Sequence, residues 1–289
     1  MPKVSGFTIV RNALKLSYPF LESVRSGLAL CDEYIIACGK SDDATRALCA
    51  QLEAESPDKI RILETEWSRD KQSGGFQLKH QSDLAMRACT GDWCLYVQAD
   101  EVLHEADYPA IRKNLLRANE RPEIDGLVFD YCHFYGGYDY EIRGRNWYRR
   151  EVRLFKNGRG IEAFRDAQGF RRSGQRLNVL PAQARVFHYG YVRTPDSLGT
   201  KSAEMAQWWG DTLPEKPPAE TLHRHFGLRR FRATHPALMR ERIAHTPPFD
   251  PTQCTRKWDW NEIKNAMTLV FESVVPVRLG EFRNYEITR

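Results

Sequence analysis

Over its first hundred residues the sequence alternates short apolar segments with amphipathic helical patterns. In chain order, strands are expected at 6–10, 33–38, 59–64 and 93–98, and helices at 19–29, 43–55 and 76–89. This alternation is typical of βαβ units, in which parallel strands form one sheet and helices cover both of its faces. The sequence therefore predicts an α/β fold built on a Rossmann-like, mostly parallel sheet.

The pattern becomes less regular after this region. A helix is expected at 105–119, a strand at 126–129, an aromatic loop at 131–140 with a tight turn at Gly136 and Gly137, renewed alternation at 147–156, a long glycine-containing irregular stretch at 158–174, a strand at 186–193, and helices from 197 to about 209 and at 261–274. Ser41 and Asp42 are placed to cap the helix at 43–55. The segment 214–218 resembles a linker, which divides the chain into a domain at 1–213 and a mainly helical extension at 214–289.

The strand at 93–98 runs directly into two carboxylates, Asp100 and Glu101. Open α/β sheets bind ligands at the carboxyl ends of their strands, and Mg²⁺ and Mn²⁺ prefer oxygen ligands. This position therefore suits a divalent metal. The alternative interpretation is a strand that ends in a polar turn.

The composition is that of a soluble globular protein, with 42% hydrophobic and 28% charged residues. No apolar run approaches the roughly 20 residues that span a bilayer, and no targeting segment is recognised, so a cytoplasmic location is expected. The seven cysteines form no Cys-x-x-Cys pair, which favours reduced thiols over a zinc site.

Positive charge is concentrated in one part of the chain. Residues 143–245 contain 21 Lys and Arg against 9 Asp and Glu, whereas the remaining residues contain 22 against 29. An excess of this size attracts phosphates, anionic glycans, nucleic acid or an acidic membrane surface. The alternative is a solvated basic face.

Three motifs occur in a characteristic order: Phe7-Thr8-Ile9-Val10-Arg11-Asn12, Gly39-Lys40-Ser41-Asp42-Asp43-Ala44-Thr45, and Gly91-Asp92-Trp93 leading to Gln98-Ala99-Asp100-Glu101. In this order they resemble the first strand, the second nucleotide loop and the Asp-x-Asp strand of family 2 glycosyltransferases of the GT-A fold, of the bacterial surface-polysaccharide type. The resemblance is clearest over 4–105 and continues more loosely to about 200.

The resemblance implies a nucleotide-sugar-dependent transferase, expected to be an inverting hexosyltransferase assisted by Mn²⁺ or Mg²⁺. The nucleotide-sugar half would be 1–105 and the acceptor half 106–213. The implied acceptor is a hydroxyl of a glycan or lipid-linked molecule, with an anionic acceptor suggested by the basic region. Such an acceptor is compatible with peripheral contact at the inner face of a membrane.

The same resemblance assigns site residues. Asp100 matches the second Asp of the metal motif, and Gln98 takes the first position, where an amide suits a ribose hydroxyl. His188, at the end of an apolar strand, looks like the His that completes the metal site, or is a buried structural His. Positions matching the nucleotide-sugar contacts are Arg11, Asn12, Asp42, Lys79, Gln98 and Arg193.

Two positions depart from the family pattern. Ala37 and Cys38 stand where many relatives carry Asp residues that recognise uracil, which leaves the base open. The usual Glu-Asp pair of the catalytic base is absent, and the candidates in the loop at 160–170 are Asp166, which is favoured, and Glu162.

Other classes fit less well. Dehydrogenases and P-loop enzymes require glycine motifs that this sequence lacks, and sugar-nucleotide pyrophosphorylases carry a Gly-rich loop where Arg11 to Leu14 stand. Nucleic-acid binding at 223–232, which is basic and aromatic, has no recognised motif in its support. A catalytically silent GT-A-fold protein that binds a glycan or a partner is the main alternative.

Overall fold

The computed structural model describes residues 1–68, 74–193, 195–206, 208, 222–256, 259–275, 278–279 and 283–288. The linker expected at 214–218 and the domain boundary beside it lie outside these residues. So does the end of the helix expected to reach about 209.

The strands are β1 (Val4–Val10), β2 (Glu33–Gly39), β3 (Ile60–Thr65), β4 (Trp93–Tyr96), β5 (Glu101–Leu103), β6 (Gly126–Tyr135), β7 (Gly137–Ile142), β8 (Arg150–Lys156), β9 (Ile161–Phe164), β10 (Gly169–Arg172), β11 (Leu177–Tyr191), β12 (Leu228–Arg230) and β13 (Tyr285–Ile287). The α-helices are α1 (Phe20–Leu28), α2 (Thr45–Glu55), α3 (Phe76–Arg87), α4 (Tyr108–Asn119), α5 (Pro195–Ala206), α6 (Arg240–Ala244) and α7 (Trp260–Val274). Short 3-10 helices lie at Glu105–Asp107, Ala237–Met239 and Pro251–Gln253.

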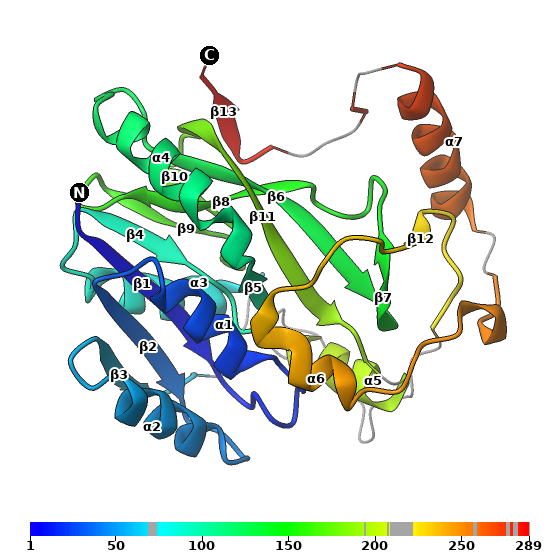
Figure 1. The fold of residues 1–289 in the computed structure, drawn as a ribbon, viewed down its shortest axis with the longest axis horizontal. Coiled ribbons are helices and arrows are strands. Elements are labelled where there is room, and N and C mark those ends of the chain that lie inside the picture. Colours follow the sequence, from blue (N-terminus) through cyan, green and yellow to red (C-terminus); the bar gives the residue numbers. More distant parts are fainter. Residues whose placement is uncertain are drawn as a thin grey trace.

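The N-terminal half is the predicted parallel sheet (Figure 1). Its strands run in the order β4-β1-β2-β3, and all three pairings are parallel. Residues of α1 and α2 belong to the apolar core on one face, and residues of α3 to the core on the other. Both faces of the sheet are therefore covered, which explains why β1, β2 and β4 read as continuous apolar runs rather than as alternating ones.

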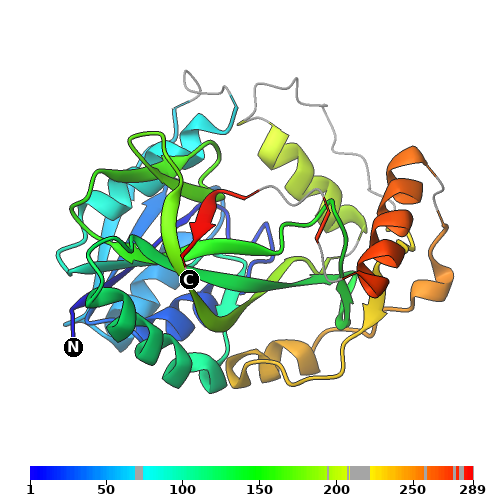
Figure 2. The same cartoon turned by 90° about the horizontal axis from the view of Figure 1, so that it is seen from above.

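Beyond β4 the sheet becomes mixed. β8 pairs antiparallel with β4 and β6, and the long strand β11 lies parallel to β6 and antiparallel to β5. The C-terminal part contributes the helix α7, and its short strands β12 and β13 extend the same sheet beside β7 and β11 (Figures 1 and 2). The α/β fold class, with helices on both faces and a helical C-terminal part, is confirmed.

Three local predictions are wrong. The expected aromatic loop at 131–140 is the second half of β6 and most of β7, joined at Gly136 with φ +73°. The expected irregular stretch at 158–174 contains the β9–β10 hairpin. Helix α2 begins at Thr45, whose N–H donates to the Asp43 carboxylate at 2.9 Å, so Ser41 and Asp42 do not cap it.

All seven cysteines are free, and six of them are buried. No helix within the described residues has the length and apolar character needed to cross a membrane.

A buried ion pair fixes the chain just after β4. The Arg153 guanidinium donates to both oxygens of Glu101, at 3.0 and 2.8 Å, and neither side chain is exposed to solvent. Glu101 also accepts from the Tyr131 hydroxyl at 2.6 Å and from the backbone N–H of Gln98 at 3.0 Å. Glu101 therefore points into the protein and holds the 98–101 turn, while its neighbour Asp100 faces a cavity.

Replacing Glu101 by alanine should lower the free energy of unfolding by about 3–5 kcal/mol, because it leaves the Arg153 charge buried without a partner. Urea denaturation checks this. Glu123→Ala is the matched control, since Glu123 pairs with Arg121 on the surface, and it should leave the midpoint almost unchanged. Equal losses in the two variants would contradict the structural role of the pair.

Candidate active site

A cavity of about 260 Å³ opens at the carboxyl ends of β1 and β4, the sheet edge where the sequence predicts a ligand. It is lined by the end of β1, the 96–100 segment, the 166–168 loop, the end of β11 and helix α5. Of the ten predicted site residues, five line it: Arg11, Gln98, Asp100, Asp166 and His188. Chain folding thus gathers half of the predicted set in one place.

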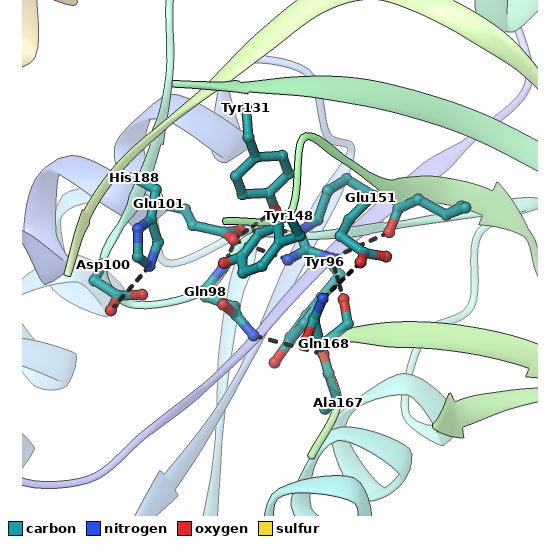
Figure 3. Close-up of polar contacts among 12 residues, drawn as sticks. Tyr96, Gln98, Asp100, Glu101, Tyr131, Tyr148, Glu151, Ala167, Gln168 and His188 are labelled. Carbon is teal, nitrogen blue, oxygen red and sulfur yellow. Dashed lines mark hydrogen bonds and ion pairs between the residues drawn. The ribbon is translucent and has the colours of Figure 1, made fainter. Parts of the chain in front are cut away.

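Asp100 and His188 meet in this cavity from two strand ends (Figure 3). His188 Nε2 lies 3.6 Å from Asp100 Oδ2, and both residues are buried. The other ring nitrogen, Nδ1, is 3.0 Å from Nδ1 of His133. Folding therefore brings Asp100 and His188 together in one cavity, and their sharing a metal ion stays a prediction.

The hydrogen bonds of His133 define how His188 is oriented. His133 Nε2 lies 2.7 Å from the Tyr148 carbonyl oxygen, which can only accept, so Nε2 carries the proton. Burial and the neighbouring His188 lower the pKa of His133 to about 3, so its ring is neutral and its Nδ1 accepts from His188 Nδ1. His188 Nε2 faces Asp100, so an imidazole nitrogen and a carboxylate oxygen lie side by side, an arrangement that suits a cation between them.

Lys201 of α5 supplies such a positive charge. Its Nζ donates to Asp100 Oδ2 at 2.9 Å and to the Gly190 carbonyl at 3.1 Å, and it lies 5.3 Å from the ring centroids of Tyr18 and Tyr191. Burial alone would raise the pKa of Asp100, but the Lys201 ammonium and His188 outweigh it and hold that pKa well below its usual value. Asp100 is therefore an ionised acceptor.

The residues around Asp100 fit a divalent cation that takes two ligands from the protein. Asp100 Oδ2 and His188 Nε2 are oxygen and imidazole donors close enough to contact one ion. Gly190 leaves room beside them, because a Cβ there would lie 2.5 Å from Asp100 Oδ2 and 2.8 Å from His188 Cε1. Lys201 would have to turn aside for the ion. Within the described part of the chain, no group of three or more His, Cys, Asp or Glu is arranged to hold a metal.

The predicted nucleotide loops lie at one side of the cavity. Arg11 lines it and pairs with Glu204 of α5 at 3.1 Å and with Asp42 at 3.3 Å. Asn12 is buried in the left-handed conformation, φ +54°, and exchanges hydrogen bonds with Asp42. Asn12 and Asp42 therefore join the two loops outside the cavity lining and hold Arg11 in place.

Three further predicted residues lie outside the cavity lining. Lys79 on α3 pairs with Asp83 at 2.7 Å and with Glu162 of β9 at 2.6 Å, so Lys79 and Glu162 neutralise each other. Arg193 is buried behind Tyr18, with its guanidinium carbon 5.1 Å from that ring, and donates to the Gly190 carbonyl at 2.9 Å.

Asp166 reaches the cavity from a tight turn. Its neighbours Arg165 and Ala167 both have left-handed backbone angles, φ +56° and +61°. A Cβ on Gly75 would lie 2.7 Å from the Cβ of Asp166, so this glycine permits the close approach of α3. Backbone strain of this kind is common where a side chain is presented for function.

Several cavity residues carry no sequence signal that identifies them. Lys201 lies on a helix thirteen positions after His188, and aromatic residues Tyr18, Trp67, Tyr148, Tyr191 and Trp208 line the walls. The Trp67 indole N–H is packed against Gly39 and has no hydrogen-bond partner among the described residues. Such residues come from five separate segments and are brought together only by folding.

Behind the cavity, burial raises the pKa of Glu151 to about 7, although Arg153 and a hydrogen bond from Gln168 oppose the shift. The folded state therefore keeps this carboxyl protonated at pH values where the unfolded chain ionises it. Between pH about 4.3 and about 7, the free energy of unfolding should fall by up to about 1.4 kcal/mol per pH unit from this group.

Urea unfolding of the parent and of Glu151→Gln across pH 4–8 tests this expectation. As pH rises through this window, the free energy of unfolding of Glu151→Gln should increase relative to that of the parent. If the unfolding free energies of parent and variant change with pH in parallel, the expectation is contradicted.

No family model matches the chain, and no curated protein matches it either. Among solved structures, TarS from S. aureus matches at 11% identity with a TM-score of 0.41, over 71% of this chain and 39% of that one. Mannosyltransferase PcManGT from Pyrobaculum calidifontis, in complex with GDP-Man and Mn²⁺, matches at 18% identity and TM-score 0.34, over 44% of this chain and 35% of that one.

Glucosyl-3-phosphoglycerate synthase from Mycobacterium tuberculosis, in complex with Mn²⁺, UDP and phosphoglyceric acid, matches at 20% identity and TM-score 0.29, over 47% of this chain and 44% of that one. The chain thus spans less than half the length of these three structures. Because all three TM-scores are below 0.5, any function has to follow from the site itself. In the order of its motifs the chain resembles family 2 glycosyltransferases of the GT-A fold.

Proposed function

We propose that this protein is a glycosyltransferase that moves a sugar, most simply a hexose, from a nucleotide-diphosphate donor to an acceptor hydroxyl with inversion. The observation that carries the proposal is the meeting of Asp100 and His188, 88 positions apart, in one buried cavity at the carboxyl edge of the parallel strands. The proposed donor-binding half is 1–105, the proposed acceptor half is 106–213, and 214–289 forms an extension.

The charges of the cavity suit a diphosphate leaving group. Negative charge grows on the diphosphate as the glycosidic bond breaks, and fixed positive groups stabilise it. Among the described residues of the cavity lining, Lys201 and Arg11 are the cations, and each is paired with a carboxylate, Asp100 and Glu204 respectively. A Mn²⁺ or Mg²⁺ ion, held by Asp100 and His188, would act as a Lewis acid toward the diphosphate.

The aromatic walls suit the rest of the donor. The Gln98 amide lines the cavity and suits a ribose hydroxyl. Asp166, which also lines the cavity, is proposed as the base that takes the proton from the acceptor hydroxyl. The acceptor is proposed to be a glycan or a lipid-linked molecule, with the protein in the cytoplasm or at the inner face of a membrane.

A thermal-shift screen of nucleotide diphosphates and their sugars, with Mn²⁺ and with EDTA, tests donor binding. At about 100 times its dissociation constant, a ligand stabilises the folded state by roughly 2.7 kcal/mol, so the true base should stand out from the others. A screen without any hit would contradict the proposal.

One observation favours the alternative of a catalytically silent binding protein. The Lys201 ammonium already occupies the Asp100 oxygen that a metal would contact. Donor binding without hydrolysis of the sugar nucleotide, and without transfer to any offered glycan, would support this alternative.

A further inference from the structure

A second and larger cavity, of about 690 Å³, lies between the sheet and helix α7. Strands β6, β7 and β8 and the inner face of α7 line it, at the edge of the molecule where β7, β12 and α7 lie near one another (Figure 1). The proposed function above gives this cavity no role. We refer to it as the arginine cavity.

Its lining carries an excess of positive charge. It contains three carboxylates, Asp130, Glu141 and Glu272, and six arginines, Arg143, Arg149, Arg150, Arg185, Arg229 and Arg278. Two further arginines, Arg230 and Arg232, line an adjoining cavity that shares Glu141, Arg143, Arg185 and Arg229. Within these two linings guanidinium groups therefore outnumber carboxylates by eight to three.

The ion pairs of the lining leave positive charge uncompensated. Arg149 pairs with Glu272 at 2.7 Å and Arg150 with Asp130 at 2.6 Å. Glu141 is shared by Arg229 at 2.6 Å and Arg143 at 3.5 Å, so one carboxylate faces two guanidinium groups. Arg185 forms no ion pair with a carboxylate in the described residues, and its guanidinium lies over the Phe187 ring.

Guanidinium groups recognise planar or tetrahedral oxyanions through paired N–H donors. The side chains of Arg143 and Arg229 are 57% and 48% exposed, which leaves donors directed at solvent. The lining is thus suited to a carboxylate or a phosphate of a ligand rather than to a neutral group.

The arginine cavity adjoins the proposed donor site. Tyr148 lines both cavities, and His133, in the arginine cavity, contacts His188, which lines the other. The two cavities are therefore separated by a wall about one side chain thick. The arginine cavity and the proposed transfer site are therefore neighbours.

We propose that the arginine cavity binds the anionic group of the acceptor, so that the substrate is a glycan bearing a carboxylate or a phosphate. This assignment rests on the proposed glycosyltransferase function. It locates the acceptor specificity in Arg143, Arg185 and Arg229, and these residues contact neither Asp100 nor His188.

Calorimetric titration of the protein of residues 1–289 tests the assignment. The probes are trigalacturonate, a trimer of glycerol phosphate and neutral maltotriose, each added with the nucleotide diphosphate that gives the largest thermal shift present at saturation. The parent should bind an anionic probe at least about tenfold more tightly than maltotriose, and the preference should weaken as salt shortens the Debye length from about 10 Å at 0.1 M. The stronger anionic probe identifies the group as a carboxylate or a phosphate.

The informative variant is Arg143→Ser with Arg185→Ser, which keeps the Arg229–Glu141 pair and the fold. Its control is Lys113→Ser with Arg117→Ser, which removes two exposed charges from α4 outside the cavity. The cavity variant should lose about tenfold or more in affinity for the anionic probe and keep its nucleotide binding, while the control keeps both.

Equal losses in the two variants would overturn the proposal in favour of diffuse charge attraction. No preference of the parent for either anion would also overturn it. If no nucleotide binds while trigalacturonate still binds through Arg143 and Arg185, the acceptor role is overturned together with the proposed function, and the anion site alone remains.

Discussion

Replacing Asp100 by asparagine should reduce sugar transfer by about a thousandfold or more while leaving the fold intact. The carboxylate is the ionised group that faces both His188 and Lys201, and its loss removes the charge that holds a divalent ion or the ammonium in place. Electrostatic stabilisation of a leaving group contributes several kcal/mol, and each 1.36 kcal/mol is about tenfold in rate. Initial rates and metal-dependent nucleotide binding measure the effect.

Asp58→Asn is the matched control, because Asp58 is an exposed carboxylate outside the cavity and its loss should leave the rate unchanged. His188→Ala should reproduce the loss of metal-dependent nucleotide binding. Transfer at the parent rate by both Asp100→Asn and His188→Ala would disprove the metal assignment.

Replacing Asp166 by asparagine should lower turnover by roughly 10² to 10⁴ while nucleotide binding stays nearly constant. A positioned general base contributes about this much to a rate, and Asp166 is the carboxylate of the 160–170 loop that reaches the cavity. The comparison of kcat with the nucleotide affinity separates a role in the proton transfer from one in donor binding.

Glu162→Gln supplies the control for Asp166. Glu162 neutralises Lys79 outside the cavity lining, so its removal should affect stability modestly and turnover little. If Glu162→Gln lowers turnover severely and Asp166→Asn lowers it only mildly, Glu162 rather than Asp166 is the base. A product with the same anomeric configuration as the donor would exclude inversion, whichever carboxylate matters.

Local sequence was sufficient for the N-terminal half of the fold. The apolar runs that became β1, β2, β3 and β4 and the amphipathic segments that became α1 to α3 carry their own periodicity, and a parallel order follows from their alternation. The same order placed Asp100 after a strand end, where it lines the 260 Å³ cavity. These features could be predicted because each depends on neighbours within about ten residues.

Strand pairing over long sequence distances explains why the segment 131–140 is not the predicted loop. The segment 131–140 reads as a loop, because Tyr and His side chains break the apolar pattern, yet it continues β6 and enters β7. Its aromatic residues pack against β11, which lies about fifty residues further along the chain. Pairing partners that lie this far away leave no local periodicity to detect.

The sequence alone determined the parallel half of the sheet and which strand ends carry polar groups. Only the tertiary structure decided which of those groups share a cavity. Lys201 pairs with Asp100 inside it. Lys79 pairs with Glu162 outside the cavity lining, and Glu101 points into the protein to pair with Arg153. The arginine cavity likewise gathers residues from positions 130 to 278. The physical reason is that electrostatic pairing and burial depend on distance in space, whereas sequence patterns report only the periodicity of neighbouring residues.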